Sequence, residues 1–396
     1  MRNGNQDLTK DAGGIDLSQY HAKAENHGYV TRLSDIAAGD SAKFLDVGVD
    51  TAETARAGTF IQKDRSVIHS HSSQEGVTVM SISQAQGTYP WLADYLWRHI
   101  DPDKDAFTAR AKSDPHEGYF IRSAPGVHVP QPVQSCLYIA KEGFSQNVHN
   151  VVIAEEGSSV QIITGCATAP HLVSGLHVGV SEFYVKKGAQ LYFTMIHDWG
   201  RQVNVRPRTV VHVEAGGVFV SNYISLKPVG SLQMFPTTLL AGEGAVARFN
   251  SVLVAGQGCT LDVGSRVILS APGTRAEIIS RAIAAGGTIV ARGELIGTCP
   301  GVKAHLECKG LILKEGLMRA IPELSGTVPG VEMSHEAAVG KIDQGEIEYL
   351  MARGVDEEEA ISMIVRGFLN VDIEGLPVSL RQKIDRIIHD TQKDMM

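Results

Sequence analysis

The middle of the chain, from about residue 134 to residue 313, alternates short β-branched hydrophobic runs with polar turns that contain glycine. The glycines that mark these turns are Gly157, Gly188, Gly216, Gly244, Gly258, Gly273 and Gly287. Their separations are 31, 28, 28, 14, 15 and 14 residues, which fits one unit of about 14 residues or twice that unit. A strand, a turn and a second strand returning to the same edge form such a unit, and stacked units bury a continuous apolar column. We therefore expect a β-solenoid. A β-sandwich, whose strands recur every ~8 to 12 residues, is the alternative.

The pattern turns helical after about residue 340. Gly354 stands where a first helix would end, and Asp356 with Glu359 forms an N-terminal capping signal for a second helix through Phe368. A third amphipathic segment, 380–390, places isoleucines on one stripe. The acidic residues at the start of the second helix have the wrong charge for a DNA-binding helix-turn-helix. These helices are better suited to docking a protein partner.

The first third of the chain is mixed in character. Residues 90–100 carry a hydrophobic stripe at helical spacing that stops at Asp101 and Pro102, which predicts a helix packed on the core. A break rich in Gly and Pro follows at residues 123–132. We expect an N-terminal α/β region over 1–125, a β-solenoid core over 126–338 and a C-terminal helical domain over 339–396.

The composition narrows the class of protein. A chain of 396 residues with 43% hydrophobic side chains can form two or three folding units, and 41 glycines with 6% aromatic residues favour strands and turns. The net charge of −8 argues against nucleic acid and anionic membrane surfaces as partners. No apolar run approaches the ~20 residues that span a bilayer, and the N-terminal residues lack the apolar region of a signal peptide. A cytoplasmic protein is expected.

Common enzyme signatures are absent. GxxxxGK[ST], GxGxxG, GxSxG and HExxH do not occur, so we expect no nucleotide site on this chain and no local catalytic motif. The five cysteines are widely spaced and form no CxxC, so we expect neither a zinc knuckle nor a disulfide framework. They are Cys136, Cys166, Cys259, Cys299 and Cys308.

The densest group of possible metal ligands lies late in the chain. Cys308 is followed further along the sequence by the adjacent pair His335 and Glu336. Thiolate, imidazole and carboxylate together suit iron or zinc, and thiolate in particular binds iron–sulfur species. The spacing between Cys308 and this pair is close to two of the units found above, so we expect the two sites at the same edge of the stack. The competing interpretation makes Cys308 a small buried hydrophobe and His335 a residue at a helix start.

A second cysteine with possible chemistry is Cys166. It follows a hydrophobic run and stands in a segment flanked by Gly165 and Pro170, which predicts a turn in which the thiol is reachable. A reachable thiol suits the acceptance of sulfur as a persulfide. The competing interpretation is a turn cysteine without a function.

Several segments resemble the SufB/SufD family of iron–sulfur cluster assembly scaffolds. The C-terminal segments that carry the resemblance are 306–313 (LECKGLIL), 334–342 (SHEAAVGKI), 349–355 (YLMARGV) and 358–368 (EEAISMIVRGF). Further matching segments are 101–109, 126–130, 165–170 and 176–183. The resemblance covers most of the chain and is weak in the first hundred residues.

The resemblance implies an architecture and a set of partners. It implies a mainly β protein, with a right-handed parallel β-helix core between a mixed α/β N-terminal region and a C-terminal helical domain. Family members dimerise through the β-helix, here as a homodimer or with a SufD-like paralogue. They bind the ABC-type ATPase SufC through the helical domain, so that the nucleotide is bound by the partner. A sulfur donor and apo-protein acceptors are the remaining partners.

The resemblance also implies residue roles. In SufB-like members the cysteine at the position of Cys308 and the glutamate at the position of Glu336 hold the nascent cluster, whereas in SufD-like members the histidine at the position of His335 takes part. This chain has all three, so a homodimer could supply both half-sites. Cys166 matches the family's candidate sulfur acceptor, with transfer through the β-helix interior towards Cys308.

The sequence thus leads to one function and two alternatives. We expect a SufB-like scaffold, not an enzyme, that transiently holds an iron–sulfur cluster and releases it to apo-proteins. The first alternative is a SufD-like structural adaptor that binds the ATPase and completes the dimer without carrying the cluster. The second, a carbohydrate-active β-helix enzyme, is disfavoured because the chain has only three Trp residues and no export signal.

Overall fold

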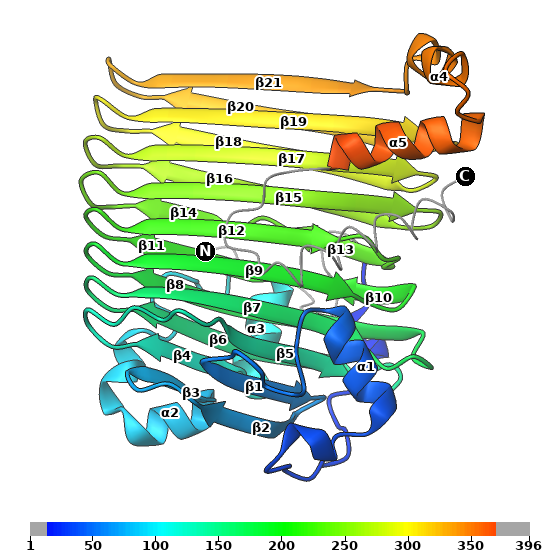
Figure 1. Cartoon of the computed structure of the whole chain (residues 1–396). Coiled ribbons are helices and arrows are strands. Elements are labelled where there is room, and N and C mark those ends of the chain that lie inside the picture. The colour runs from blue at the N-terminus through cyan, green and yellow to red at the C-terminus, as the bar shows by residue number, and fades with distance from the viewer. Residues whose placement is uncertain (1–13, 370–396) are drawn as a thin grey trace, which may run out of the picture.

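The computed structural model of the protein describes residues 14–369. Two long sheets of mainly parallel strands are stacked face to face, and the chain passes from one sheet to the other as it climbs the stack (Figure 1). The expected mainly β fold and the β-solenoid are therefore confirmed, and the sandwich alternative is wrong. We call the space between the two sheets the lumen.

The front sheet of Figure 1 contains ten strands. In spatial order they are β2 (Ser66–Ser72), β1 (Gly58–Lys63), β5 (Val133–Ile139), β7 (Ser159–Thr168), β9 (Gln190–Asp198), β12 (Val218–Ser225), β15 (Val246–Gly256), β17 (Arg275–Ala285), β19 (Lys303–Leu313) and β21 (Glu332–Gly340). The first pair, β1 with β2, is antiparallel, and the other neighbours are parallel.

The rear sheet contains the remaining strands. They are β3 (Val77–Ser81), β4 (Tyr119–Ser123), β6 (Ser145–Ala154), β8 (Ser174–Val185), β10 (Gln202–Val205), β11 (Arg208–Val213), β13 (Ser231–Met234), β14 (Thr237–Leu240), β16 (Thr260–Leu269), β18 (Thr288–Gly297) and β20 (Leu317–Gly326). The α-helices are α1 (Ala38–Asp46), α2 (Ile82–Thr88), α3 (Ala106–Ser113), α4 (Gln344–Met351) and α5 (Glu357–Leu369), and short 3-10 turns span Leu17–Gln19, Leu33–Asp35 and Pro90–Asp94.

One column of glycines sets the length of a coil. Gly126, Gly157, Gly188, Gly216, Gly244, Gly273, Gly301 and Gly330 all have φ between 64° and 81°, a region that residues with a side chain rarely adopt. The turns stack directly, since Gly188 N–H donates to Ala215 O (2.9 Å) and Gly216 N–H to Glu243 O (2.8 Å). Residues that lie directly opposite each other on neighbouring strands are one coil apart in the sequence, which is the step between successive glycines of this column. Examples are Ile278 opposite Leu306 and Ser159 opposite Gln190.

The shorter unit expected from the glycine spacing is half of this coil. Gly258 and Gly286, with φ of 80° and 84°, mark turns at the opposite edge of the stack. A strand of ten or eleven residues carries the chain from one edge to the other, so only the doubled unit returns to its starting edge. The expectation that the shorter unit returns to the same edge is therefore wrong.

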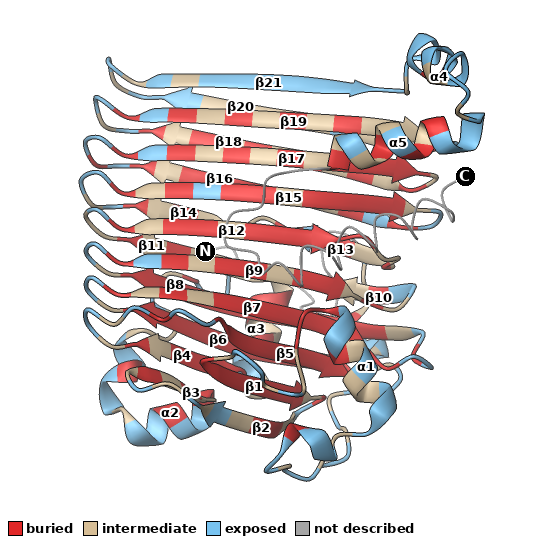
Figure 2. Ribbon diagram, viewed as in Figure 1, coloured by how far each residue is buried: buried red, intermediate tan, exposed pale blue. Residues whose placement is uncertain are grey.

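The lumen holds the hydrophobic core. Side chains along β16 and β18 alternate between buried and half-buried positions, because one side of each strand faces the lumen. Figure 2 shows buried residues across the middle strands, whereas β21 at the top of the stack is exposed along most of its length. Burial therefore decreases from the middle of the stack towards the last coil.

The N-terminal region continues the two sheets. β1 lies parallel to β5, and β4 lies parallel to β6, so the chain on both sides of residue 125 contributes to the same sheets. α1 lies against β7, and α2 and α3 contact the rear sheet. The proposed boundaries at 125/126 and 338/339 stay sequence predictions.

The helix expected over residues 90–100 is wrong beyond its first turn. Only Pro90–Asp94 is helical, as a 3-10 turn, and Trp97 has a φ of 58°. The reason is Glu182 of β8, which is 1% exposed and accepts hydrogen bonds from the backbone N–H groups of Trp97 (2.5 Å) and His99 (2.8 Å). A buried carboxylate of the solenoid therefore overrides the local helical pattern.

We expect Glu182→Gln to lower the free energy of unfolding by about 2 kcal/mol, measured by denaturant titration. One of the two backbone N–H groups would then face an amide NH₂ group at a buried position. Glu142→Gln is a matched control, because Glu142 also accepts two backbone N–H groups, from Val173 (2.8 Å) and Ser174 (2.7 Å), but is exposed. A loss at position 182 no larger than at position 142 would contradict the role assigned to Glu182.

The C-terminal helices form largely as expected. α4 ends before Gly354, which has a φ of 89°, and Asp356 caps α5 by accepting the Glu359 N–H (2.9 Å). The third expected helix, 380–390, lies outside the described residues. Between residues 14 and 369, no helix has both the length and the apolar character needed to cross a bilayer.

Candidate functional site

Cys308 lies in the middle of β19, one strand below the last coil. Its side chain faces the lumen and the residue is 4% exposed. Burial raises the pKa of the thiol to about 11, and the nearby Arg281 guanidinium offsets this only in part. At neutral pH the free thiol is therefore protonated, and binding of a metal must displace that proton.

The last strand brings one of the two other expected ligands to the same face. Cys308 lies opposite Ala337 of β21, and in-register partners of parallel strands point to the same side of the sheet. His335, two residues before Ala337, therefore faces the lumen side together with Cys308. Glu336 faces the outer side. The expectation that His335 begins a helix is wrong, because it lies within a strand.

Glu336 is grouped with other charged residues on the outer face. It lies opposite Glu307, which is ion-paired with Arg281 and lies 3.2 Å from the Lys309 ammonium group. Burial alone would raise the pKa of Glu307, but Arg281 and Lys309 outweigh it and lower the pKa below its usual range. The structure thus places Cys308 and His335 on the same face of the front sheet and Glu336 on the opposite face.

The last coil, residues 317–340, leaves the solenoid open; we call it the open end. In the part of the chain that the structure describes, β20 pairs only with β18 and β21 only with β19. Leu317 and Val339 are 66% and 40% exposed. Pro322 fits this position, because a proline is tolerated in an edge strand. Unpaired strand edges with exposed apolar side chains are a template for pairing with another chain.

The candidate metal ligands near the open end do not form a complete metal site within the described residues. Within residues 14–369, no three His, Cys, Asp or Glu side chains lie close enough together to bind one metal ion. Met318 Sδ occupies the space that a side chain on Gly310 would need, so a soft thioether also lies near the level of Cys308. A metal ion bound by Cys308 and His335 would therefore need further ligands from a second chain or from a rearrangement.

Cys166 is not in a turn, and the prediction that its thiol is reachable is wrong. It lies within β7 and is 1% exposed. Gly165 is part of the same strand, where the Val47 side chain occupies the space that a Cβ atom would need. The glycine therefore permits close packing of the N-terminal region. Burial also raises the pKa of the Cys166 thiol far above its usual range.

The structure places polar groups around Cys166 that the sequence analysis missed. His197 of β9 lies directly opposite Cys166, and its Nδ1 is 2.8 Å from the Tyr223 hydroxyl. Trp199 packs against His197 with ring centroids 5.4 Å apart. The sequence held a signal for this neighbour. The number of residues from Gly157 to Gly188 is one coil, and the same number of residues counted forward from Cys166 leads to His197.

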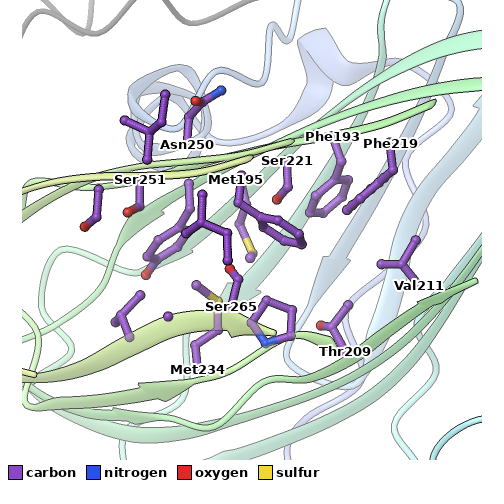
Figure 3. Close-up of a pocket in the computed structure, with 18 of the residues that line it drawn as sticks. Phe193, Met195, Thr209, Val211, Phe219, Ser221, Met234, Asn250, Ser251 and Ser265 are labelled. Atoms are coloured by element: carbon purple, nitrogen blue, oxygen red, sulfur yellow. The ribbon is translucent and has the colours of Figure 1, made fainter. Parts of the chain in front are cut away.

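A cavity lies in the lumen between the levels of Cys166 and Cys308. Its volume is about 40 Å³, room for two or three water molecules. Figure 3 shows Phe193, Met195 and Phe219 of the front sheet facing Thr209 and Met234 of the rear sheet. The lining also includes Tyr223, which contacts His197, and Ser280, which lies opposite Cys308. The cavity therefore adjoins the neighbours of both thiols.

The raised pKa of Cys308 predicts an unusual pH dependence of its reactivity. Since the thiolate is the nucleophile, we expect the rate of alkylation by iodoacetamide to rise about tenfold per pH unit and to keep rising beyond about pH 9.5. The rate is read from the alkylated peptide by mass spectrometry on the folded protein. A rate that levels off near pH 9, as for an ordinary thiol, would contradict the burial of this group.

Comparisons with known proteins agree with this architecture. A sequence profile described as "SUF system FeS cluster assembly, SufBD core domain" matches residues 137–368. An iron–sulfur cluster assembly SufBD family protein of Archaeoglobus fulgidus is 50% identical over 358 residues, which cover 90% of this chain and 96% of the relative. One of Methanothermobacter thermautotrophicus is 46% identical and covers 96% and 95% of the two chains, and one of Staphylococcus epidermidis is 33% identical and covers 87% and 76%. The chain therefore belongs to the SufBD family of iron–sulfur cluster assembly proteins.

Proposed function

We propose that the protein is a SufB-like scaffold on which an iron–sulfur cluster is assembled before transfer to apo-proteins. The observation that carries this proposal is the buried Cys308 thiol, which shares the lumen face with His335 one strand below the open end. Thiolate and imidazole are established ligands of iron–sulfur centres. A cluster held by few protein thiolates is released readily, as a scaffold requires.

The proposed site is completed by a second copy of the chain. The unpaired edges of β20 and β21 and the exposed Leu317 and Val339 support pairing at the open end. A two-fold axis there would bring two Cys308 thiols and two His335 imidazoles to one seam. This dimer would supply the ligands that are missing from one chain.

Glu336 remains a proposed ligand of the nascent cluster. Its carboxylate lies on the outer side of β21, so it reaches Cys308 only if the edge strand rearranges. The exposure of this strand along most of its length is compatible with such movement. In the proposed cycle, ATP turnover in a SufC-type partner drives the rearrangement.

The proposed docking surface for the ATPase is formed by α4 and α5. Tyr349, Met351 and Met363 expose 57%, 42% and 42% of their surface on these two helices. Exposed methionines and aromatic residues are typical of protein interfaces. The acidic first turn of α5 adds a charged rim to this surface.

Sulfur is proposed to pass from Cys166 to Cys308 along the lumen. The cavity that adjoins Tyr223 at one end and Ser280 at the other supports this direction. Because Cys166 is buried, loading of this thiol requires an opening of the lumen. The cytoplasmic location stays a prediction from the sequence.

Anaerobic purification of the chain together with its ATPase partner tests the proposal. We expect a homodimer of this chain that acquires iron and sulfide when both are supplied, measured by metal analysis, sulfide analysis and light scattering. A homodimeric complex that binds no cluster, or that gains one only with a second SufBD-type chain, would favour the SufD-like adaptor instead.

A further inference from the structure

Two buried N–H groups in the lumen beside Cys166 have no hydrogen-bond acceptor. His197 is 3% exposed and Trp199 is 5% exposed. Among the residues that the structure describes, the His197 Nε2 and the Trp199 Nε1 atoms are buried without a partner. A buried donor without a partner costs about 1 to 3 kcal/mol, so two adjacent ones indicate a place for a ligand or a water molecule.

The contact of His197 Nδ1 with a phenol is the basis on which we assign the proton of this ring. Its Nδ1 is 2.8 Å from the Tyr223 hydroxyl. Burial raises the pKa of Tyr223, so the phenol keeps its proton at neutral pH. The Tyr223 O–H can therefore donate to His197 Nδ1, and we assign this direction to the contact. In a neutral imidazole the proton therefore stands on Nε2, which makes this atom a donor.

The imidazole stays neutral in this environment, and the indole is held in place. Burial, together with the nearby His177, lowers the pKa of His197 far below its usual range. Trp199 packs between His197 and His177, with the His177 and Trp199 ring centroids 5.0 Å apart. His177 in turn bonds the Gln146 side chain through Nδ1 (3.0 Å). Both donors thus belong to rigid, neutral side chains.

Cys166 is the group of the lumen that could carry an acceptor for these donors. It lies directly opposite His197 in the parallel pair of β7 and β9, and both side chains face the lumen. The thiol itself is protonated, because burial raises its pKa. An added sulfur atom changes this, since the terminal sulfur of a persulfide loses its proton far more readily than a thiol.

We propose that the His197 Nε2–H and the Trp199 Nε1–H donate hydrogen bonds to the terminal sulfur of a persulfide on Cys166. This inference rests on the proposed role of Cys166 as sulfur acceptor and names the two residues that position the acquired sulfur. Fixed N–H groups that await a developing anion stabilise it without reorganisation. The two neutral N–H groups would stabilise an anionic sulfur in the lumen without forming an ion pair with it.

The sulfur transfer that loads the site is balanced without an oxidant. The Cys166 sulfur attacks the terminal sulfur of a polysulfide, a new S–S bond forms, and one S–S bond of the polysulfide breaks. The shortened polysulfide leaves with the electron pair and takes up the proton that Cys166 loses. Cys166 then carries one sulfane sulfur, and the total oxidation state is unchanged.

Inorganic polysulfide is a suitable probe, because it is small and needs no partner protein. The full chain is incubated anaerobically with polysulfide and desalted, and the fraction of Cys166 that carries an extra sulfur atom is followed by peptide mass spectrometry. We expect Trp199→Phe, which keeps the ring packing and removes the N–H group, to shorten the lifetime of this persulfide about tenfold. Trp91→Phe, at a residue that is 36% exposed, is the matched control and should leave the lifetime unchanged.

Position 197 provides a second test with rescue. His197→Leu removes the donor and should also shorten the lifetime about tenfold, whereas His197→Gln retains a side-chain N–H donor and should restore most of it. Thermal unfolding verifies that each variant is folded. If Cys166 acquires sulfur and keeps it equally long in all variants, the two N–H groups bind water and the inference is overturned, while the proposed scaffold function stands. If Cys166 of the unchanged protein acquires no sulfur, the inference and the proposed sulfur path both fall.

Discussion

A Cys308→Ala variant is expected to retain at least about tenfold less iron and sulfide than the unchanged protein after anaerobic reconstitution. The thiol is the strongest iron–sulfur ligand near the open end, and within residues 14–369 no three candidate side chains lie close enough together to replace it as a metal site. Its lumen-facing position below β21 also shields it from water. The measurement is the iron and sulfide content per chain, together with the visible absorption of the cluster.

Cys259→Ala is the matched control for this experiment. Cys259 is 4% exposed, the same fraction as Cys308, and it lies at the turn before β16, away from the open end. Both substitutions remove a buried sulfur atom and should lower stability by a similar amount. Only the change at position 308 should remove the cluster. Full iron and sulfide content in Cys308→Ala, or equal losses in both variants, would reject the assignment.

The coil of the solenoid could be predicted because it depends on local backbone chemistry. Gly157, Gly188 and Gly216 adopt left-handed φ angles that a turn at the same edge requires in every coil. Such positions leave a visible mark in the sequence. The sequence did not show that Gly258 belongs to the opposite edge, because both edges use the same kind of turn. The half-coil was therefore taken for the whole repeat.

The separation of Glu336 from Cys308 could not be predicted for a related reason. Residue spacing predicted that His335 and Glu336 return to the same edge of the stack as Cys308, but it did not give the register to within one residue. A shift of one residue exchanges the two faces of a strand. In the structure Cys308 lies opposite Ala337, the residue after Glu336, which leaves His335 on the lumen side and Glu336 outside.

Two further errors have tertiary causes. Gly165 was interpreted as a turn residue, but its small size serves the close approach of Val47 from the N-terminal region. The stripe over residues 90–100 has helical spacing, but Glu182 binds the backbone of Trp97 and His99 and holds the segment in a non-helical turn, with Trp97 at a φ of 58°. In both places a residue far away in the sequence determines the local structure, and no local pattern reports it.

Val339→Lys is expected to raise the dissociation constant of the proposed dimer about a hundredfold. Val339 stands at the mouth of the lumen on β21 and is 40% exposed in one chain. At a two-fold seam the substitution replaces an exposed apolar side chain of each copy by a lysine and places two like charges close together. The oligomeric state is measured by light scattering over a range of protein concentrations.

The same variant separates the dimer from the chemistry of the thiol. Val339→Lys leaves Cys308 and His335 in place, so any loss of cluster must follow from loss of the second chain. We therefore expect iron and sulfide content to fall together with the dimer fraction and to recover at high protein concentration, because mass action restores the seam. Val173→Lys, at a valine that is 48% exposed just before β8, controls for the added charge and should change neither quantity. A monomeric Val339→Lys variant that binds a full complement of iron would show that one chain suffices, and the shared site would have to be abandoned.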